Sequence, residues 1–357
     1  MIFIVEQIIR RKTRQVMCGN VAIGGDAKVS IQSMTNTHTK DIKNTVNQIL
    51  ELEEAGCEII RVAVADIDDA KAIKEIKKQI DIPIISDIHF DYRLALEAVD
   101  SGVDKLRINP GNIGGIENVK KVVEKVKPRS IPIRIGVNSG SIDKKILEKY
   151  NGHATAEGMV ESALEHIRIL EGLDYNNTII ALKSSNVKIT VDAYRLMSQK
   201  VDYPLHIGVT ESGTYLKGTI KSSIGIGSLL LDGIGDTMRV SLTDKPVEEI
   251  KVAKEILNSI GVRSFGINFI SCPTCGRTRI NLIELAKKIE KELSHVNKNI
   301  TVAIMGCAVN GPGEAREADI GIAGGIGEAL LFKKGEIIRK VPEDEIISCL
   351  LKEIDNM

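Results

Sequence analysis

Short β-branched runs alternate with amphipathic helical patterns between residues 29 and 258. Each run is followed by a polar turn and then by apolar residues three and four positions apart, the period of a helix with one buried face. The runs predict strands at Val29–Met34, Glu58–Val64, Ile82–Asp87, Lys105–Asn109, Ile131–Val137, Thr178–Lys183, Pro204–Val209 and Thr237–Ser241. The helical patterns lie at Asp41–Ala55, Asp68–Lys78, Tyr92–Ser101, Val119–Lys125, Ala156–Leu170, Val191–Ser198, Thr214–Leu231 and Pro246–Asn258.

A succession of eight strand–helix pairs has the size of a (β/α)8 barrel. The main rival, a doubly wound open sheet, usually carries a glycine-rich dinucleotide turn after its first strand. Residues 33–37 read Ser-Met-Thr-Asn-Thr at that position, without such glycines. The sequence therefore favours an α/β fold with a TIM barrel over residues 1–262.

The pattern changes after residue 262, and residues 263–357 predict a compact α+β unit. Strands are expected at Gly266–Ile270, Thr301–Met305, Asp319–Ala323 and Ala329–Phe332, and helices at Asn281–Leu293 and Glu343–Ile354. Two of these strands lead directly toward cysteines. This placement makes the second unit the candidate for a metal centre.

Composition narrows the possible functions. The 48 basic and 48 acidic side chains give a formal charge of zero, and Trp is absent, which argues against nucleic-acid binding. No apolar run approaches the roughly 20 residues that span a bilayer, and no basic region precedes the apolar start, so we expect neither a membrane span nor a secretory signal. A cytoplasmic location follows as an expectation. Six cysteines are too few for a disulfide scaffold.

Three cysteines form the strongest chemical signal. Cys272 and Cys275 make a Cys-x-x-Cys pair, and Cys307 follows the next predicted strand, which a strand–helix–strand path returns to the pair. The next candidate ligand is Glu314, in a glycine- and proline-rich loop. Three soft thiolates and one hard oxygen suit a [4Fe–4S] cluster with one exchangeable iron. A structural zinc site, unligated thiols and a merely solvated Glu314 remain alternatives.

The barrel strands carry an unusual number of cations. Residues at the carboxyl ends of barrel strands face the active site, and buried cations are costly unless an anion neutralises them. Guanidinium forks match phosphate oxygens two at a time, so the set predicts a doubly phosphorylated or diphosphate ligand. Internal ion pairs with Asp87, Glu58 and Glu211 are the alternative. The set comprises Arg61, Arg107, Arg134, Lys183 and Arg239.

Two histidines accompany these cations. His89 and His206 are candidate general acids or hydrogen-bond donors to the ligand. Each is almost equally well explained as a core histidine with satisfied hydrogen bonds. The sequence leaves these alternatives open.

Six segments together carry a likeness to a known family. They are Arg10–Val16, Asp87–Asp91, Arg107–Gly114, Ile234–Thr237, Cys272–Cys275 and Asn310–Glu314, of which the last two are highly specific in combination. Through them the chain resembles, over essentially its whole length, the bacterial 4-hydroxy-3-methylbut-2-enyl diphosphate synthases of the non-mevalonate isoprenoid pathway. Ala308 replaces an expected Val and Ser184 an expected Ala, and neither is a proposed ligand.

The resemblance implies a TIM barrel followed by a ferredoxin- and sulfite-reductase-like iron–sulfur domain. The implied substrate is 2-C-methyl-D-erythritol 2,4-cyclodiphosphate, opened by two-electron reduction with loss of water. Reduced ferredoxin or flavodoxin would supply the electrons. The family forms homodimers in which the cluster domain of one chain caps the barrel of the other.

The resemblance also assigns residues by motif. Cys272, Cys275, Cys307 and Glu314 would ligate the cluster, and Glu314 would leave on substrate binding and then serve in catalytic proton transfer. The implied substrate-binding residues are Arg61, Arg107, Asn109, Arg134, Asn138, Lys183, His206 and Ser241. Two alternatives are a pterin-type methyl-transfer barrel with a structural zinc domain and a non-enzymatic iron sensor. The neutral charge and the cationic barrel argue against nucleic-acid binding by such a sensor.

Overall fold

The computed structural model describes residues 8–293, 296, 298–308, 313 and 315–357. It divides the chain into two compact units, Met1–Arg263 and Ser264–Met357. Among the described residues, no helix has the length and apolar character needed to cross a membrane.

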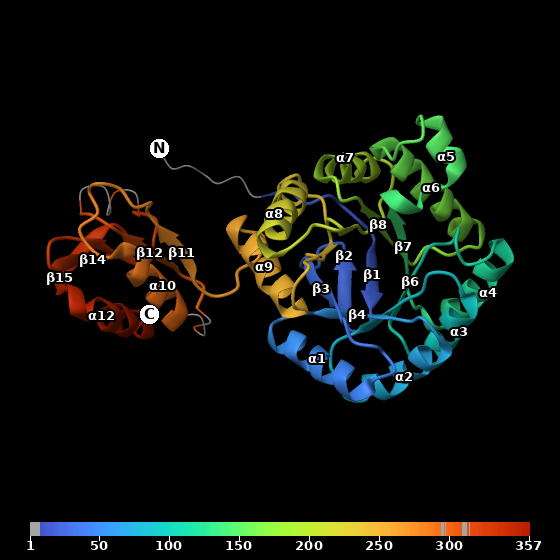
Figure 1. The fold of residues 1–357 in the computed structure, drawn as a ribbon, viewed down its shortest axis with the longest axis horizontal. Coiled ribbons are helices and arrows are strands. Elements are labelled where there is room, and N and C mark those ends of the chain that lie inside the picture. Colours follow the sequence, from blue (N-terminus) through green and yellow to red (C-terminus); the bar gives the residue numbers. More distant parts are fainter. Residues whose placement is uncertain (1–7, 294–295, 297, 309–312, 314) are drawn as a thin grey trace. The chain divides into compact units, whose positions relative to one another are not determined.

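The first unit is a parallel barrel, which confirms the predicted fold class (Figure 1). Its strands are hydrogen-bonded in the order β8-β7-β6-β5-β4-β3-β10-β9, and an isolated bridge between Ile180 and Leu205 joins β8 to the chain beside β9. Nearly every strand residue is buried, as expected for a parallel sheet covered on both faces. The bounds are β3 (Ser30–Met34), β4 (Ile59–Ala63), β5 (Ile84–Asp87), β6 (Lys105–Ile108), β7 (Ile133–Asn138), β8 (Thr178–Lys183), β9 (His206–Ile207) and β10 (Thr237–Met238).

Helices surround this sheet, and Figure 1 shows them as an outer ring. Side chains of the preceding loops cap several of them: Asp66, Asp91 and Asn186 accept backbone N–H groups at the starts of α2, α3 and α7. Such caps fix where each strand-to-helix loop ends. The bounds are α1 (Ile42–Glu54), α2 (Ile67–Lys77), α3 (Tyr92–Asp100), α4 (Ile116–Val126), η1 (Lys127–Arg129), η2 (Ser139–Ser141), α5 (Lys144–Lys149), α6 (Ala156–Gly172), α7 (Val187–Ser198), α8 (Tyr215–Leu231) and α9 (Pro246–Ser259).

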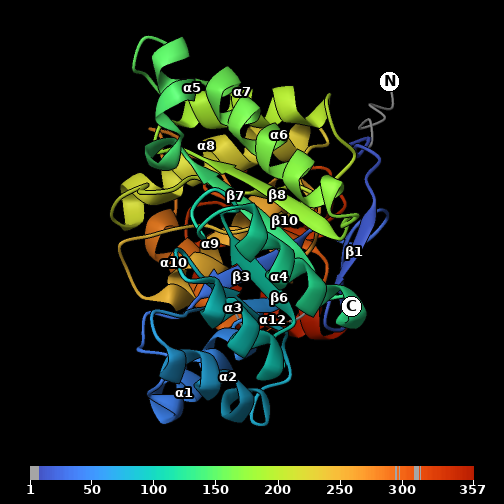
Figure 2. The same ribbon diagram turned by 90° about the vertical axis from the view of Figure 1, so that its right-hand side faces the viewer.

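An antiparallel hairpin of β1 (Gln15–Cys18) and β2 (Val21–Gly24) covers the amino-terminal end of the barrel, and sequence analysis did not predict it. Val16 and Cys18 of the hairpin pack against residues at the starts of barrel strands, including Ile59 and Ile85. Figure 2 shows β1 at one end of the barrel. The opposite end, where the strands finish, stays available for a site.

The basic segment before the hairpin has a structural role. Arg10 pairs with Asp236 at 3.0 Å, and the Arg11 guanidinium donates to the carbonyl groups of Ser198, Val201 and Tyr203. These contacts hold the segment before the hairpin against the residues that precede β9 and β10. The basic residues near the start are therefore used for folding, and the ligand site is built from other cations.

The second unit is a five-stranded sheet with helices on one face. The strand order is β11-β12-β13-β14-β15, with β11, β12 and β13 parallel and the last two pairs antiparallel. Ile289 of α10 and Leu350 of α12 pack on one face, and Ala303, Ala323 and Phe332 form the core of the other. The bounds are β11 (Asn268–Ser271), α10 (Leu282–Leu293), β12 (Thr301–Met305), β13 (Ile320–Gly324), β14 (Glu328–Lys333), β15 (Glu336–Pro342), η3 (Glu343–Glu345) and α12 (Ile346–Asp355).

Candidate functional site

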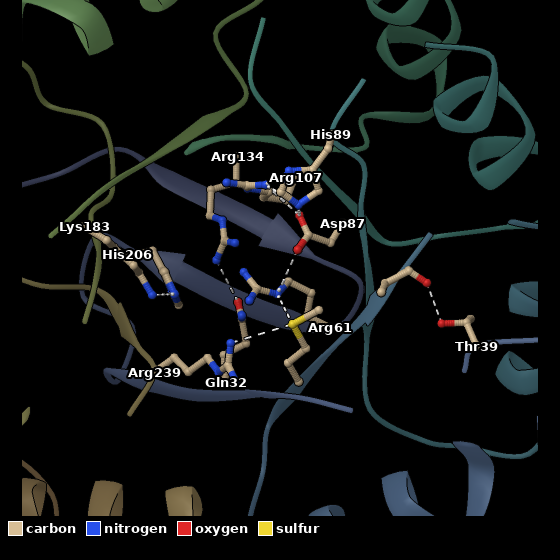
Figure 3. A network of polar contacts seen from close by, with 12 residues as sticks. Gln32, Thr39, Arg61, Asp87, His89, Arg107, Arg134, Lys183, His206 and Arg239 are labelled. Atoms are coloured by element: carbon tan, nitrogen blue, oxygen red, sulfur yellow. Dashed lines mark hydrogen bonds and ion pairs between the residues drawn. The ribbon is translucent and has the colours of Figure 1, made fainter. Parts of the chain in front are cut away.

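A cavity of about 300 Å³ lies at the carboxyl end of the barrel strands. Strand side chains alternate between the barrel interior and the helices, so residues two positions apart share the interior. This alternation directs Arg61 of β4, Arg107 of β6 and Arg134 of β7 toward one another (Figure 3). The predicted substrate-binding residues that line the cavity are Arg61, Arg107, Arg134, Asn138, Lys183 and Ser241.

Two predicted substrate-binding residues do not line this cavity. The Asn109 side chain is buried, and its Oδ1 accepts the Gly111 N–H at 3.0 Å, which shapes the loop after β6. His206 is fully buried, with Nε2 3.3 Å from Nζ of Lys183 (Figure 3). Burial and the neighbouring charge of Lys183 lower the pKa of His206 well below its usual value. The structure therefore places His206 behind a cavity residue, as a neutral imidazole.

One carboxylate lies among the arginines. Asp87 of β5 approaches Arg107 at 3.0 Å and Arg61 at 3.7 Å, and His89 lies 3.1 Å from Arg107. Burial opposes ionisation of Asp87, but the charges of Arg61 and Arg107 outweigh it and hold the pKa of Asp87 well below its usual range. Asp87 thus forms internal ion pairs with two of the arginines, Arg61 and Arg107.

Two other cations of the cavity, Arg134 and Lys183, have fewer polar contacts to offset their charge. Nη1 of Arg134 lies 3.4 Å from the amide oxygen of Gln32, and its Nε has no hydrogen-bond partner among the described residues. Burial lowers the pKa values of Arg134 and Lys183 well below their usual values, and the surrounding arginines lower them further. An unpaired cation in such a site is costly, and an anionic ligand would remove that cost.

Arg239, just after β10, completes the cationic lining and pairs with Glu249 of α9 at 3.1 Å. Glu249 was not predicted as part of the site, because an acidic residue in the first turn of a helix ordinarily faces solvent, where it interacts favourably with the helix dipole. Among the described residues, five cationic side chains of the cavity thus meet two buried carboxylates, Asp87 and Glu249. The excess positive charge is suited to a multiply charged anion.

The candidate metal centre lies in the second unit. Ser271 and Ile304 are paired across parallel β11 and β12, so Cys272 and Cys307 follow strand ends on the same edge of the sheet. The Gly306 N–H donates to the Cys272 sulfur at 3.1 Å. Hydrogen bonds of this kind to sulfur accompany iron–sulfur ligation. Cys272 therefore lies beside the residue that precedes Cys307.

Cys275 lies on an exposed turn after Cys272. The Thr278 N–H donates to the Cys275 carbonyl at 3.0 Å and closes this turn. Hydrogen bonding from the Arg277 backbone, and then from its side chain, lowers the pKa of Cys275 and so favours the thiolate, which is the form that binds metals. All six cysteines are free thiols.

These residues form only part of a ligand set. Within the described residues, the structure does not bring three metal-binding side chains into one group. Glu314, the predicted fourth ligand and catalytic residue, lies outside the described residues. The free thiols, the shared strand edge and the N–H···S contact nevertheless fit a sulfur-ligated cluster.

Comparison with known proteins identifies relatives over nearly the whole chain. A family model described as the GcpE TIM-barrel domain matches residues 13–254, and one described as the GcpE protein C-terminal domain matches residues 268–356. A protein from Clostridium perfringens named 4-hydroxy-3-methylbut-2-en-1-yl diphosphate synthase (flavodoxin) is 62% identical over 348 residues, which cover 98% of this chain and 99% of that protein. A protein of the same name from Ruminiclostridium cellulolyticum is 60% identical over 350 residues, with coverage of 98% and 99%.

A solved structure of dihydropteroate synthase from Stenotrophomonas maltophilia is a more distant match. It is 13% identical, has a TM-score of 0.49 and covers 68% of this chain and 98% of its own.

Proposed function

The chain belongs to the GcpE family, and from this premise we propose that it is a 4-hydroxy-3-methylbut-2-en-1-yl diphosphate synthase. Its reaction would be the two-electron reductive ring opening of 2-C-methyl-D-erythritol 2,4-cyclodiphosphate, with loss of water. This reaction supplies isoprenoid precursors by the non-mevalonate pathway. The observation that carries the proposal is the cavity lined by five cationic side chains, which among the described residues pair with only two buried carboxylates.

The barrel would bind the two phosphates of the substrate. Arg61 and Arg107 are already held by Asp87, which leaves them ordered before the substrate arrives. Among the described residues, no carboxylate lies within hydrogen-bond distance of Arg134 or Lys183. These two cations would therefore gain the most from the negative charge of a bound phosphate. Asn138 and Ser241 line the same cavity and would donate hydrogen bonds to the ring or its phosphates.

Cys272, Cys275 and Cys307 would hold a [4Fe–4S] cluster, with Glu314 as a replaceable fourth ligand. When bound, such a cluster supplies electrons one at a time and a Lewis-acidic iron. We propose that the Glu314 carboxyl group delivers the proton with which the hydroxyl group leaves as water. Reduced flavodoxin, which the names of the relatives mention, or reduced ferredoxin would be the electron donor.

The test is turnover of the cyclodiphosphate by anaerobically purified full-length protein with reduced flavodoxin, after iron, zinc and acid-labile sulfide have been measured. About four irons and four sulfides per chain, together with the diphosphate product, are expected. Zinc without sulfide would overturn the redox proposal and would support the alternative of a pterin-type methyl-transfer barrel with a structural zinc domain. The names of the close relatives do not favour that alternative. A protein with a full cluster that leaves the cyclodiphosphate unchanged would overturn the substrate assignment.

The homodimer, in which the second unit of one chain caps the barrel of the other, stays a prediction. Sedimentation of the full-length protein tests it directly. A mixture of two inactive variants, one altered at Arg134 and one at Cys307, should regain part of its activity if the two units act across chains. A mixture that stays inactive would contradict that arrangement.

A further inference from the structure

Glu249 is a buried carboxylate with four hydrogen-bond donors. Its side chain, which is 4% exposed, lies in the first turn of α9. Oε2 accepts Nε of Arg239 at 3.1 Å and Oγ of Ser33 at 3.0 Å. Oε1 accepts Nη2 of Arg239 and the backbone N–H of Leu242, both at 3.1 Å. Both oxygens therefore have two donors each, which leaves little capacity to bind a ligand directly.

The pairing determines which part of Arg239 remains available. The carboxylate occupies the Nε and Nη2 edge of the guanidinium, and Nη1 lies 3.7 Å from the sulfur of Met34, another cavity residue. A thioether is a weak acceptor, so the Nη1 donors remain free for a stronger one. Held in this way, Arg239 presents one fixed donor group to the cavity.

The same carboxylate also restrains the chain that follows β10. The Leu242 N–H bonds to Glu249 instead of to a neighbouring strand, and Ser241, the preceding residue, lines the cavity. Ser33 belongs to β3, the strand beside β10. Glu249 thus connects α9, β3 and the segment after β10 at one point next to the cavity.

We propose that Glu249 is a positioning residue for phosphate binding: it orients Arg239 and fixes the segment that carries Ser241, without touching the substrate. This inference rests on the proposed function, because it takes a phosphate group of the substrate as the ligand of Arg239. A long side chain that is already ordered loses less conformational entropy when the ligand binds. Glu249 would therefore act through affinity and leave the chemical step unchanged.

A second ion pair in the chain supplies a matched control. Arg263 bonds to both oxygens of Glu58, at 2.7 and 3.1 Å, and Glu58 also accepts the Ile31 N–H at 2.8 Å. This pair is also a two-point contact with a backbone N–H, but it uses both Nη atoms of the arginine, and Glu58 is 33% exposed. It lies at the amino-terminal end of β4, away from the cavity. If both carboxylates were needed only for folding, replacing either one would lower stability without a specific effect on ligand binding.

The test compares E249Q and E58Q in the full-length protein with its cluster reconstituted. E249Q is expected to weaken binding of inorganic pyrophosphate and to raise KM by about tenfold, with kcat within about twofold, as for loss of one ordered charged contact. E58Q is expected to lower the unfolding temperature and leave both constants unchanged. Equal constants for E249Q and wild type, or equal losses in E58Q, would overturn the proposal.

A double-mutant cycle separates positioning from an independent effect. R239M should weaken pyrophosphate binding, and E249Q/R239M should lose less than the sum of the two single losses, since part of the Glu249 effect passes through Arg239 and the rest through the Ser241 segment. Additive losses would contradict the mechanism. If E249Q unfolds, S33A removes one donor to Glu249 and should raise KM about twofold to threefold, with no such change in the R239M background.

Pyrophosphate affinity keeps this inference distinct from the proposed function. A wild-type protein that binds pyrophosphate but does not convert the cyclodiphosphate would refute the proposed substrate. The comparison of E249Q with E58Q would still decide whether Glu249 positions an anion-binding arginine.

Discussion

Asp87 and Arg107 face each other at matching positions of β5 and β6, and their side chains form a 3.0 Å ion pair inside the barrel. Arg134 is the matching residue on the next strand, β7. Its guanidinium contacts the amide oxygen of Gln32 (Figure 3), and within the described residues it forms no ion pair with a carboxylate. Three neighbouring strands thus carry one buried carboxylate and two arginines at matching positions. The carboxylate pairs with the first arginine, and the second keeps a positive charge that a ligand could neutralise.

Replacing Asp87 with asparagine should destabilise the unliganded protein. The change keeps the volume but leaves Arg61 and Arg107 without their carboxylate, and removing one partner of a buried ion pair typically costs about 3–5 kcal/mol. Pyrophosphate should recover part of this loss, so its effect on the unfolding temperature should be larger in D87N than in wild type. Thermal unfolding with and without pyrophosphate measures both effects. An unchanged unfolding temperature would show that Asp87 contributes nothing to the unliganded fold.

The same pair predicts an acid-dependent part of the stability. The folded pKa of Asp87 is depressed, so its contribution is present above the unfolded pKa of about 3.9 and is lost as pH falls through the folded value. From about pH 6 to about pH 3, the free energy of unfolding should therefore fall more steeply in wild type than in D87N, as denaturant unfolding would measure. Parallel curves would contradict the depressed pKa.

Arg134 should affect stability and affinity in opposite directions. R134M removes a buried charge that has no carboxylate partner in the described part of the chain, so the unliganded protein should become more stable. Pyrophosphate binding should weaken by about tenfold to a hundredfold, the usual worth of a charged hydrogen bond. Calorimetric titration and thermal unfolding test the two signs, with iron and sulfide content expected to stay unchanged. A loss of both stability and affinity would indicate that Arg134 belongs to the folding core.

Much of the barrel site follows from simple periodicity. A period of two along β4, β6 and β7 is enough to place Arg61, Arg107 and Arg134 in one interior, because strand side chains alternate. Lys183 at the end of β8 and Ser241 after β10 follow from the rule that barrel sites lie at the carboxyl ends of strands. The same rule also favours Asn109, and the resemblance implies His206; the structure places both outside the lining of the cavity.

The remaining features depend on tertiary contacts that leave no local pattern. Glu249 has the sequence context of a solvated residue in the first turn of a helix, and Ser33 and Arg239 reach it from distant parts of the chain. The hairpin of residues 15–24 was not predicted because its four-residue strands are too short for a clear alternation. The edge strand β15 was missed for a different reason: its side chains are mostly exposed, so no buried face marks it.

Replacing Glu314 should reduce turnover without loss of the cluster, whereas replacing a cysteine ligand should reduce the iron content. E314Q retains the side-chain length and one oxygen but cannot deliver a carboxyl proton, so kcat should fall by about a hundredfold or more. Iron content and substrate KM should remain near wild type. Glu317, an exposed glutamate three residues later, provides the control E317Q, which should keep full activity. Turnover of E314Q within about threefold of wild type would exclude the proposed proton transfer.

Lys105 predicts a second pH effect: stability again rises with pH, but here because a destabilising buried charge is lost, whereas the Asp87 charge is stabilising. Its side chain is fully buried at the first position of β6, opposite Ile85, and its Nζ has no hydrogen-bond partner among the described residues. Burial lowers the pKa of Lys105 to about 8. A lysine with a lowered folded pKa destabilises the fold below that value, and the cost is relieved as pH rises toward the unfolded pKa of about 10.4.

K105M should therefore raise the free energy of unfolding at neutral pH by about 3 kcal/mol, the equivalent of this pKa shift. The wild-type protein should gain stability between pH of about 8 and about 10 while K105M does not, so that the two curves converge. Urea unfolding at several pH values measures this, with K188M at an exposed lysine as the control. A K105M variant that is less stable than wild type at every pH would show that the buried ammonium group is compensated inside the barrel, and would assign Lys105 to the core as a stabilising residue.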